Sequence, residues 1–263
     1  MFKLLTMDKS KIIQEIKSKG YAIINNYFSI AEIDEIKESL RETLNYIHPS
    51  DEKNLSKKYY EVKSFNTKLK GNWYDIAPHN LTLLTLLHKK DLIALIKKFF
   101  NTKVLFSGRP CIHAHDDANK HLLDAHQETS QFAVDTLVFW SPLEDTNDEN
   151  GGLSIYLDSH KKGYFEHKLE RSDNKKVWTK DYTHIPNEIT SKFQKVNLVV
   201  KSGSVVLMKS SMIHSGYPTK KRGHLRITIT ERFNPLRKLP FLKDENAPIK
   251  IPYVGVDYNS IPD

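Results

Sequence analysis

The side chains best suited to holding a metal lie in residues 124–130, whose sequence is Asp-Ala-His-Gln-Glu-Thr-Ser. His126 and Glu128 are two positions apart, so on an extended strand they point to the same side, whereas on a helix they would be roughly 200° apart. An imidazole and a carboxylate on one face can occupy two neighbouring positions around a divalent metal. His214, in Met-Ile-His-Ser-Gly, offers a third position. Two histidines and one carboxylate, with the other positions open, are the ligand set of non-haem Fe(II) oxygenases.

Two other groups of residues compete for the metal. His113, His115 and Asp117 share one face of a predicted strand and could chelate an ion themselves. Three ligands at consecutive alternate positions would make a flat, crowded site, which disfavours this alternative. His160 lies 54 residues before His214 and is the main competitor for the third ligand position. We expect it to be structural, at the end of a strand.

Several blocks of the sequence resemble the phytanoyl-CoA dioxygenase family of Fe(II)/2-oxoglutarate-dependent oxygenases. The similarity begins with the strand and helix at residues 20–40, and His126-Gln127-Glu128 resembles the family's His-Gln-Asp. The most specific blocks are Phe-Trp-Ser-Pro-Leu at 139–143, Glu-Asn-Gly-Gly-Leu at 149–153 and Asp-Ser-His-Lys-Lys-Gly at 158–163. Two residues differ from the family pattern: Glu128 replaces Asp, and Asp158 stands where Gly is common.

The resemblance implies a mainly β protein with flanking helices, namely a double-stranded β-helix (a jelly-roll, cupin-like barrel) supported by N-terminal helices. It implies the cofactors Fe(II) and 2-oxoglutarate, with O₂ as co-substrate, and release of succinate and CO₂. The expected reaction is hydroxylation of a small-molecule metabolite or sugar derivative. Two alternatives stay open at this point: a cupin-like metal-binding barrel without oxygenase activity, and an oxygenase that acts on a protein or RNA.

The resemblance also implies roles for individual residues. His126, Glu128 and His214 would bind the metal. Arg226 would bind the distal carboxylate of 2-oxoglutarate, because a guanidinium stays charged and can donate two parallel hydrogen bonds to a carboxylate. The remaining candidates are Thr228 as a hydroxyl donor and Trp140 as a border of the cosubstrate pocket, with His113, His115, Arg109 and Gln127 as further pocket lining.

The elements that must position these residues are helical first and β-rich afterwards. Apolar spacing predicts helices at 8–19, 81–87 and 91–100, and a capping box, Ser29 to Glu32, begins another. Residues 21–24 and most segments after 104 have strand patterns. Val196–Val200 and Val205–Met208 are expected to pair as a hairpin through Lys201-Ser202-Gly203-Ser204. The polar segments 48–75 and 161–184 are expected to be a loop and an insertion.

The chain is expected to form one domain over residues 1–263, with mainly helical support at 1–103, the jelly-roll core at 104–234 and a C-terminal coil at 235–263. Its net charge of +8 comes from interleaved acids and bases, which disfavours nucleic acid and favours a small, anionic substrate. A single cysteine, Cys111, excludes an intrachain disulfide. Without a signal peptide or apolar run, we expect a cytoplasmic protein that does not contact membranes. The sequence does not indicate an oligomeric state.

Overall fold

Two antiparallel sheets face each other in the computed structural model, which describes residues 7–65, 77–107, 110–116, 124–128, 136–171, 181–221 and 223–235. The major sheet has the order β1-β9-β4-β11-β2, and β3 pairs with β11 beside β2. Its strands are β1 (Tyr21–Ile24), β2 (Phe106–Ser107), β3 (Cys111–Asp116), β4 (Leu137–Pro142), β9 (Val205–Lys209) and β11 (Leu225–Asn234). These strands, closed by a smaller sheet, form the expected jelly roll.

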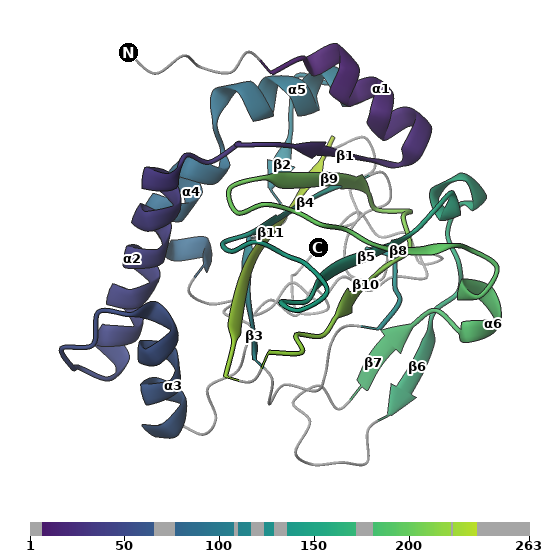
Figure 1. Ribbon diagram of the computed structural model, residues 1–263. Helices are drawn as coiled ribbons and strands as arrows, with labels where there is room; N and C mark the ends of the chain where they lie inside the picture. Colours follow the sequence, from purple (N-terminus) through teal and green to yellow (C-terminus); the bar gives the residue numbers. More distant parts are fainter. Residues whose placement is uncertain are drawn as a thin grey trace, which may run out of the picture.

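The minor sheet has the order β10-β5-β8 and consists of β5 (Gly152–Tyr156), β8 (Lys195–Asn197) and β10 (His214–Tyr217). A separate hairpin pairs β6 (Lys168–Arg171) with β7 (Asp181–His184), and it projects at the edge of the sheets (Figure 1). Short turns of helix, η2 (Ser159–Lys162) and α6 (Asn187–Thr190), precede β6 and follow β7. The hairpin therefore occupies the segment that the sequence marked as an insertion.

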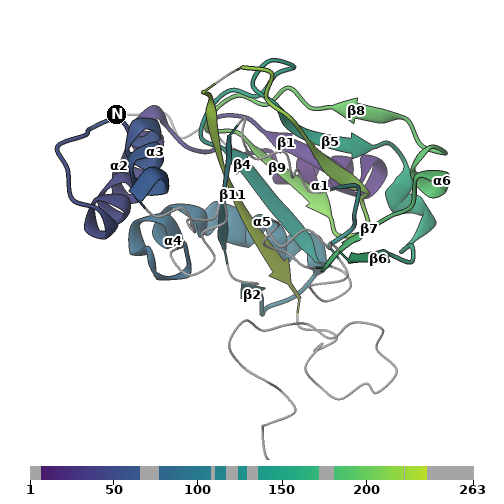
Figure 2. The same ribbon diagram turned by 90° about the horizontal axis from the view of Figure 1, so that it is seen from below.

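The helices cover the major sheet on the side away from the minor sheet, as Figure 2 shows for α2, α3 and α4 against β5 and β8. They are α1 (Lys9–Lys19), α2 (Ile30–Ile47), α3 (Leu55–Phe65), the short η1 (Ala77–His79), α4 (Leu81–Leu87) and α5 (Lys90–Phe100). The predicted capping box at the start of α2 is present, with Ser29 and Glu32 bonded reciprocally. No helix among the described residues is long and apolar enough to span a membrane.

Side chains that alternate along the strands of the major sheet pack into two apolar cores, one on each face of that sheet. In β11, Ile227, Ile229 and Phe233 join the large core under the helices, whereas Arg226 and Arg232 point to the other face. The second core lies between the two sheets and contains Val138, Trp140, Leu153, Ile155, Leu198, Val200, Val206, Met208 and Met212. A strand with period-two side chains thus provides an apolar face for the helices and a polar face for the interior of the barrel.

Two expectations about local structure are wrong. The segment 48–75 is not simply a loop, because it contains α3, whose Tyr59 and Val62 are fully buried against the large core. Its many polar residues hid this helical spacing. One of them, Lys58, is itself buried and donates to the carbonyl oxygen of His48 at the end of α2 (2.5 Å) and to the hydroxyl of Ser50 (2.6 Å).

The second correction concerns the predicted hairpin between 196–200 and 205–208. The two segments belong to different sheets, because β8 pairs with β5 and β9 pairs with β1 and β4. The connection at 201–204 carries the chain from the minor sheet to the major one, with Gly203 at φ +78°. Its turn chemistry was recognised correctly, but a turn does not determine whether its flanking strands become partners.

Candidate metal centre

The three predicted ligands converge between the two sheets. His126 and His214 form an antiparallel bridge in which each backbone N–H donates to the other's carbonyl oxygen, at 2.9 and 3.0 Å. Glu128 Oε1 lies 3.8 Å from His126 Nε2 and 3.6 Å from His214 Nε2. Within the described residues, this is the group of His, Cys, Asp and Glu side chains whose ligand atoms gather closely enough to hold a metal, all within 4.8 Å of one another.

Backbone carbonyl groups orient both imidazoles. His126 Nδ1 lies 2.7 Å from the carbonyl oxygen of Asp124, and His214 Nδ1 lies 3.1 Å from that of Met212. A carbonyl oxygen can only accept, so each Nδ1 carries the proton and each Nε2 presents a lone pair to the centre. This arrangement of a backbone acceptor behind each ring is typical of metal-binding histidines.

Glu128 is held by a buried arginine that the sequence analysis did not single out. Arg232 Nε donates to Oε2 of Glu128 at 3.2 Å, and its Nη2 donates to Oε1 at 3.1 Å. Arg232 Nη1 also donates to the Thr230 hydroxyl at 3.1 Å. Glu128 and Arg232 are each only 5% exposed, so the pair is bidentate and almost completely removed from water.

Arg226 lies on the same face of β11, at its beginning, and is only 2% exposed. Its Nη1 donates to the carbonyl oxygen of Tyr217 at 3.2 Å, while its Nε has no hydrogen-bond partner among the described atoms. Gly151, at φ +72°, makes room for it, because a Cβ there would lie 2.6 Å from Nη1 of Arg226. This contact explains the first glycine of the Asn-Gly-Gly-Leu block: without a side chain at Gly151, the buried guanidinium of Arg226 can lie against the backbone.

Other predicted residues line the same cavity. His113, His115, Trp140 and Thr228 are all part of its wall, together with the ligands and both arginines. His113 Nε2 lies 3.2 Å from the Thr230 hydroxyl, and the rings of His113 and His115 stack at 5.9 Å. The strand register explains the grouping, since Arg226 is opposite His115 and Thr228 is opposite His113.

Two predicted residues that the structure describes, Gln127 and His160, do not line this cavity. Arg109 lies outside the described residues, as does Asp117 of the competing metal set. Gln127 is fully buried, but its side chain bonds to backbone groups of Gly163, Phe165 and Ser211 instead of lining the cavity. His160 packs against Gly20, where a Cβ would lie 2.5 Å from its Nδ1, and it is not part of the metal-binding group.

Burial and charge shift the ionisation of the site. Burial alone would raise the pKa of Glu128, but the neighbouring guanidinium of Arg232 holds it well below its usual value. Burial, reinforced by the positive charge of Arg232, lowers the pKa of His113 to about 3. Burial also lowers the pKa of Arg226 to about 10. At neutral pH the site therefore contains a carboxylate, neutral His113 and charged guanidinium groups.

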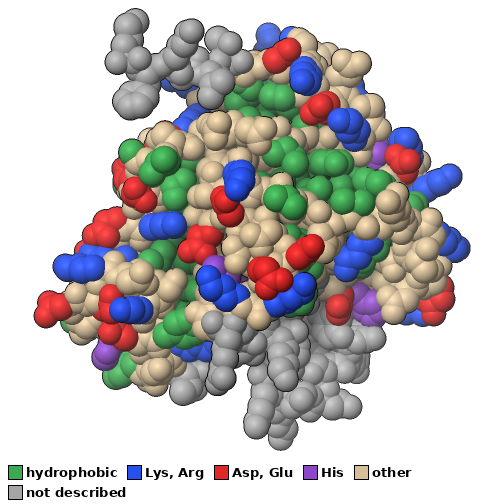
Figure 3. Space-filling view, in the orientation of Figure 1, with side chains coloured by type: hydrophobic (Ala, Val, Ile, Leu, Met, Phe, Trp, Pro, Cys, Tyr) green, Lys and Arg blue, Asp and Glu red, His purple; other side chains and the backbone are tan. Residues whose placement is uncertain are grey.

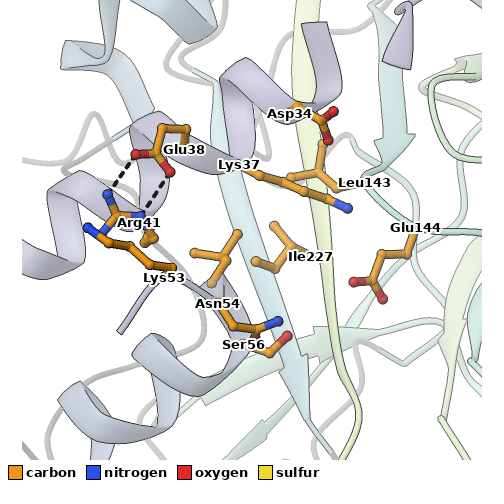
Figure 4. Close-up of a pocket in the computed structure, with 11 residues that line it drawn as sticks. Asp34, Lys37, Glu38, Arg41, Lys53, Asn54, Ser56, Leu143, Glu144 and Ile227 are labelled. Atoms are coloured by element: carbon orange, nitrogen blue, oxygen red, sulfur yellow. Dashed lines mark hydrogen bonds and ion pairs between the residues drawn. The ribbon is translucent and has the colours of Figure 1, made fainter. Parts of the chain in front are cut away.

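A larger hollow, ≈ 250 Å³ against ≈ 50 Å³ for the cavity at the metal-binding group, lies on the other face of the sheet between α2, the start of α3 and Ile227 (Figure 4). Its buried arginine, Arg41, is already bonded to Glu38 at 2.8 and 2.6 Å. It contains no cluster of metal-ligating side chains among the described residues. The larger hollow is therefore not the candidate site. The smaller cavity is, because it contains the metal-binding group.

The sequence carried a signal for Arg232 that was overlooked. The period of two that places Arg226, Thr228 and Thr230 on one face continues to Arg232, so a second cation on the cavity face could have been predicted. The partner of Arg232 could not have been predicted in this way, because Arg232 and Glu128 are 104 residues apart in the sequence.

The comparisons with known proteins agree with this geometry. The sequence model of the family "Phytanoyl-CoA dioxygenase (PhyH)" matches residues 16–223. The matched range includes His126, Glu128 and His214 and ends before Arg226 and Arg232. Among curated protein sequences, none is similar enough to count as a relative.

Several solved structures share the fold at low sequence identity. The epimerase SnoN in complex with Fe³⁺, alpha ketoglutarate and nogalamycin RO is 12% identical, with a TM-score of 0.60 over 86% of this chain and 82% of that one. HygX from Streptomyces hygroscopicus with nickel and 2-oxoglutarate is 15% identical, with a TM-score of 0.60 over 86% and 87%. EctD from S. alaskensis with 2-oxoglutarate and 5-hydroxyectoine is 12% identical, with a TM-score of 0.62 over 89% and 78%.

Proposed function

This chain belongs to the phytanoyl-CoA dioxygenase family, and from that premise we propose that it is an Fe(II)- and 2-oxoglutarate-dependent dioxygenase that hydroxylates a small molecule. The observation that carries the proposal is the convergence of His126 Nε2, His214 Nε2 and Glu128 Oε1 on one point. These three residues would hold the iron. All the groups involved belong, in this proposal, to a single oxygenase domain.

The donor set fits the metal and the cosubstrate. Two neutral imidazoles and one carboxylate leave positions open on an octahedral ion, as this chemistry requires. Arg226 fits the distal carboxylate of 2-oxoglutarate, because it is a buried cation whose Nε is unpaired among the described residues. An unpartnered buried donor is costly, and a carboxylate would satisfy it. Thr228 would add a hydroxyl donor from the same face, and Trp140 would close one wall.

When bound, iron with 2-oxoglutarate and O₂ supplies the oxidising power, converting the cosubstrate to succinate and CO₂ while a substrate C–H bond gains one oxygen atom. The residues of the chain bind and orient the cosubstrate, and they exclude water from the site. Arg226 binds and orients the dianion from one end of the cavity. Apolar walls from Val138, Leu153 and Met208 keep water away from it.

Arg232 prepares the site before a metal is present. Its bidentate contact fixes the longer Glu128 side chain, which has one more methylene than the Asp of the family pattern. It also keeps the carboxylate ionised, which is the form that binds a metal. We therefore include Arg232 as a residue that positions Glu128.

The substrate in this proposal is a small molecule. The titles of solved relatives name a nogalamycin compound for SnoN and 5-hydroxyectoine for EctD, both small molecules. Charges of both signs are interspersed on the face drawn in Figure 3, so the net charge of +8 forms no single basic patch there. Together these observations support a small metabolite rather than a polymer. Anionic character would also suit a protein with this charge balance.

The test is O₂-dependent release of succinate from 2-oxoglutarate by the Fe(II)-loaded protein. Uncoupled turnover, without a substrate, is sufficient for this measurement. His126→Ala should reduce succinate to background, because it removes one of three metal ligands. His79→Ala is the matched control, since His79 is exposed on η1 and should not alter turnover. A wild-type protein that binds Fe(II) and 2-oxoglutarate but releases no succinate would favour the cupin-like alternative.

A further inference from the structure

Gln127, between the two ligands His126 and Glu128, uses its amide to bond to another part of the chain. Its Nε2 donates to the carbonyl oxygens of Gly163 (2.9 Å) and Ser211 (2.6 Å), and its Oε1 accepts from the backbone N–H of Phe165 (2.9 Å). The side chain is 0% exposed. Both amide protons and one acceptor site of the amide are therefore engaged.

The backbone of Gln127 makes a fourth hydrogen bond, which also reaches residues 163–167. Its N–H donates to His167 Nε2 at 3.0 Å, and His167 Nδ1 in turn lies 3.1 Å from the carbonyl oxygen of Phe165. Because that carbonyl only accepts, His167 carries its proton on Nδ1 and accepts from Gln127 with Nε2. The lone pair of this imidazole is thus occupied, and His167 acts as a support for residue 127 rather than as a metal ligand.

The tripeptide 126–128 is consequently held on two edges. On one edge, His126 bonds to His214, and the N–H of Glu128 donates to the carbonyl oxygen of Ser210 at 3.1 Å. On the other edge lie residues 163–167, bonded through Gln127. Successive residues of an extended segment present their backbone groups to opposite edges, which explains why the backbone N–H groups of the two ligands face 210–214 and that of Gln127 faces His167.

Residues 163–167 lead directly into β6, and the far end of the hairpin returns to the same place. After β7, the backbone N–H of Ile185 donates to the carbonyl oxygen of Ala125 at 2.7 Å. Both ends of the β6–β7 hairpin are therefore hydrogen-bonded to residues 125–127, next to the metal-binding group. Figure 1 shows the hairpin projecting from this edge of the sheets.

We propose that Gln127 couples the β6–β7 hairpin to the metal centre, so that the hairpin becomes more ordered when the metal binds. The inference rests on the proposed function, because it assumes a metal at His126, Glu128 and His214. A metal that immobilises both neighbours of Gln127 also immobilises Gln127, and three hydrogen bonds, to Gly163, Phe165 and His167, transmit this order to residues 163–167. The coupling is reciprocal, so a small molecule that orders the hairpin also tightens metal binding.

Hydrogen–deuterium exchange on the full chain, with and without saturating Co(II), tests the coupling. In the wild type, Co(II) should slow exchange in 124–128 and 210–217 and also in 163–171 and 181–185. Slowing in the hairpin should be roughly fivefold or more, the lower end of typical coupling between sites. In Gln127→Met, which keeps the volume but lacks the amide, Co(II) should protect the ligand segments as before but protect the hairpin much less, because only the bonds from the Gln127 N–H to His167 and from Ile185 to Ala125 remain. By reciprocity its affinity for Co(II) should fall by the same factor.

Asn80→Ala provides the control for a general loss of stability. Asn80 caps α4 on the helical side, away from the hairpin, so Co(II) should still protect the hairpin in this variant. Hairpin protection that is undiminished in Gln127→Met, or that is missing from a wild type whose ligand segments are protected, would overturn the coupling alone. If Co(II) protects neither the ligand segments nor the hairpin, the metal assignment itself fails, and the coupling fails with it.

Discussion

Arg232→Met gives the sharpest test of how the site is built. Methionine has a similar length and no charge, so the change removes both hydrogen bonds to Glu128 with little change in volume. In the metal-free protein it leaves a carboxylate that is 5% exposed without its charged partner. Breaking a buried pair in this way costs about 3–5 kcal/mol, because an uncompensated charge stays inside the protein. For a chain of this size, that corresponds to a midpoint lower by roughly 6–20 °C.

A metal should reverse much of this loss. A divalent cation bound by His126, Glu128 and His214 supplies the positive charge that the variant lacks. Thermal unfolding followed with a chelator present should therefore show a much larger difference between wild type and variant than unfolding at saturating Co(II). Because ligand binding to the folded state adds stability, the Co(II)-induced rise in the midpoint should be larger for Arg232→Met than for the wild type.

A double variant separates charge from packing. Arg232→Met combined with Glu128→Gln removes both charges, and such replacements of a buried pair are often close to neutral. The double variant should therefore be more stable than Arg232→Met alone in the metal-free state. The reasoning is refuted if the double variant is less stable than the single one, or if chelator and Co(II) conditions show equal losses for Arg232→Met.

The other predictions concern the cosubstrate and pH. Arg226→Met should raise the 2-oxoglutarate concentration needed for half-maximal succinate release by roughly 10- to 150-fold, since hydrogen bonds to charged groups contribute about 1.5–3 kcal/mol. An unchanged requirement would remove Arg226 from the cosubstrate site. For pH, the unfolded chain binds a proton on His113 below about pH 6.5, whereas the folded protein resists it until about pH 3. The free energy of unfolding of the metal-free protein should therefore decrease as pH falls through this window, by up to about 1.4 kcal/mol per pH unit from this residue. Urea denaturation at pH 7.5, 6.5 and 5.5 measures the slope, which should be shallower in His113→Gln; equal slopes would contradict this account.

The sequence by itself determined the features that depend on neighbouring residues. The capping box at Ser29 and the apolar spacing after it predicted α2, because helix caps and helical period are local properties. The spacing of His126 and Glu128 predicted that they share a face, and similar blocks indicated the family. Arg226 could likewise be placed on the barrel face from the alternation in β11.

The tertiary structure decided which of these local pieces meet. Segments 196–200 and 205–208 flank a good turn but belong to different sheets, because strand partners are selected by closure of the whole barrel rather than by the turn between them. Neither the pairing of Arg232 with Glu128 nor the bonds from Gln127 to residues 163–167 has a signal in local spacing. Their energy comes from burying charges and amides beside specific partners, and burial exists only once distant segments have packed together. The three proposed ligands could therefore be named from the sequence, whereas the residues that hold them in place became visible only in the fold.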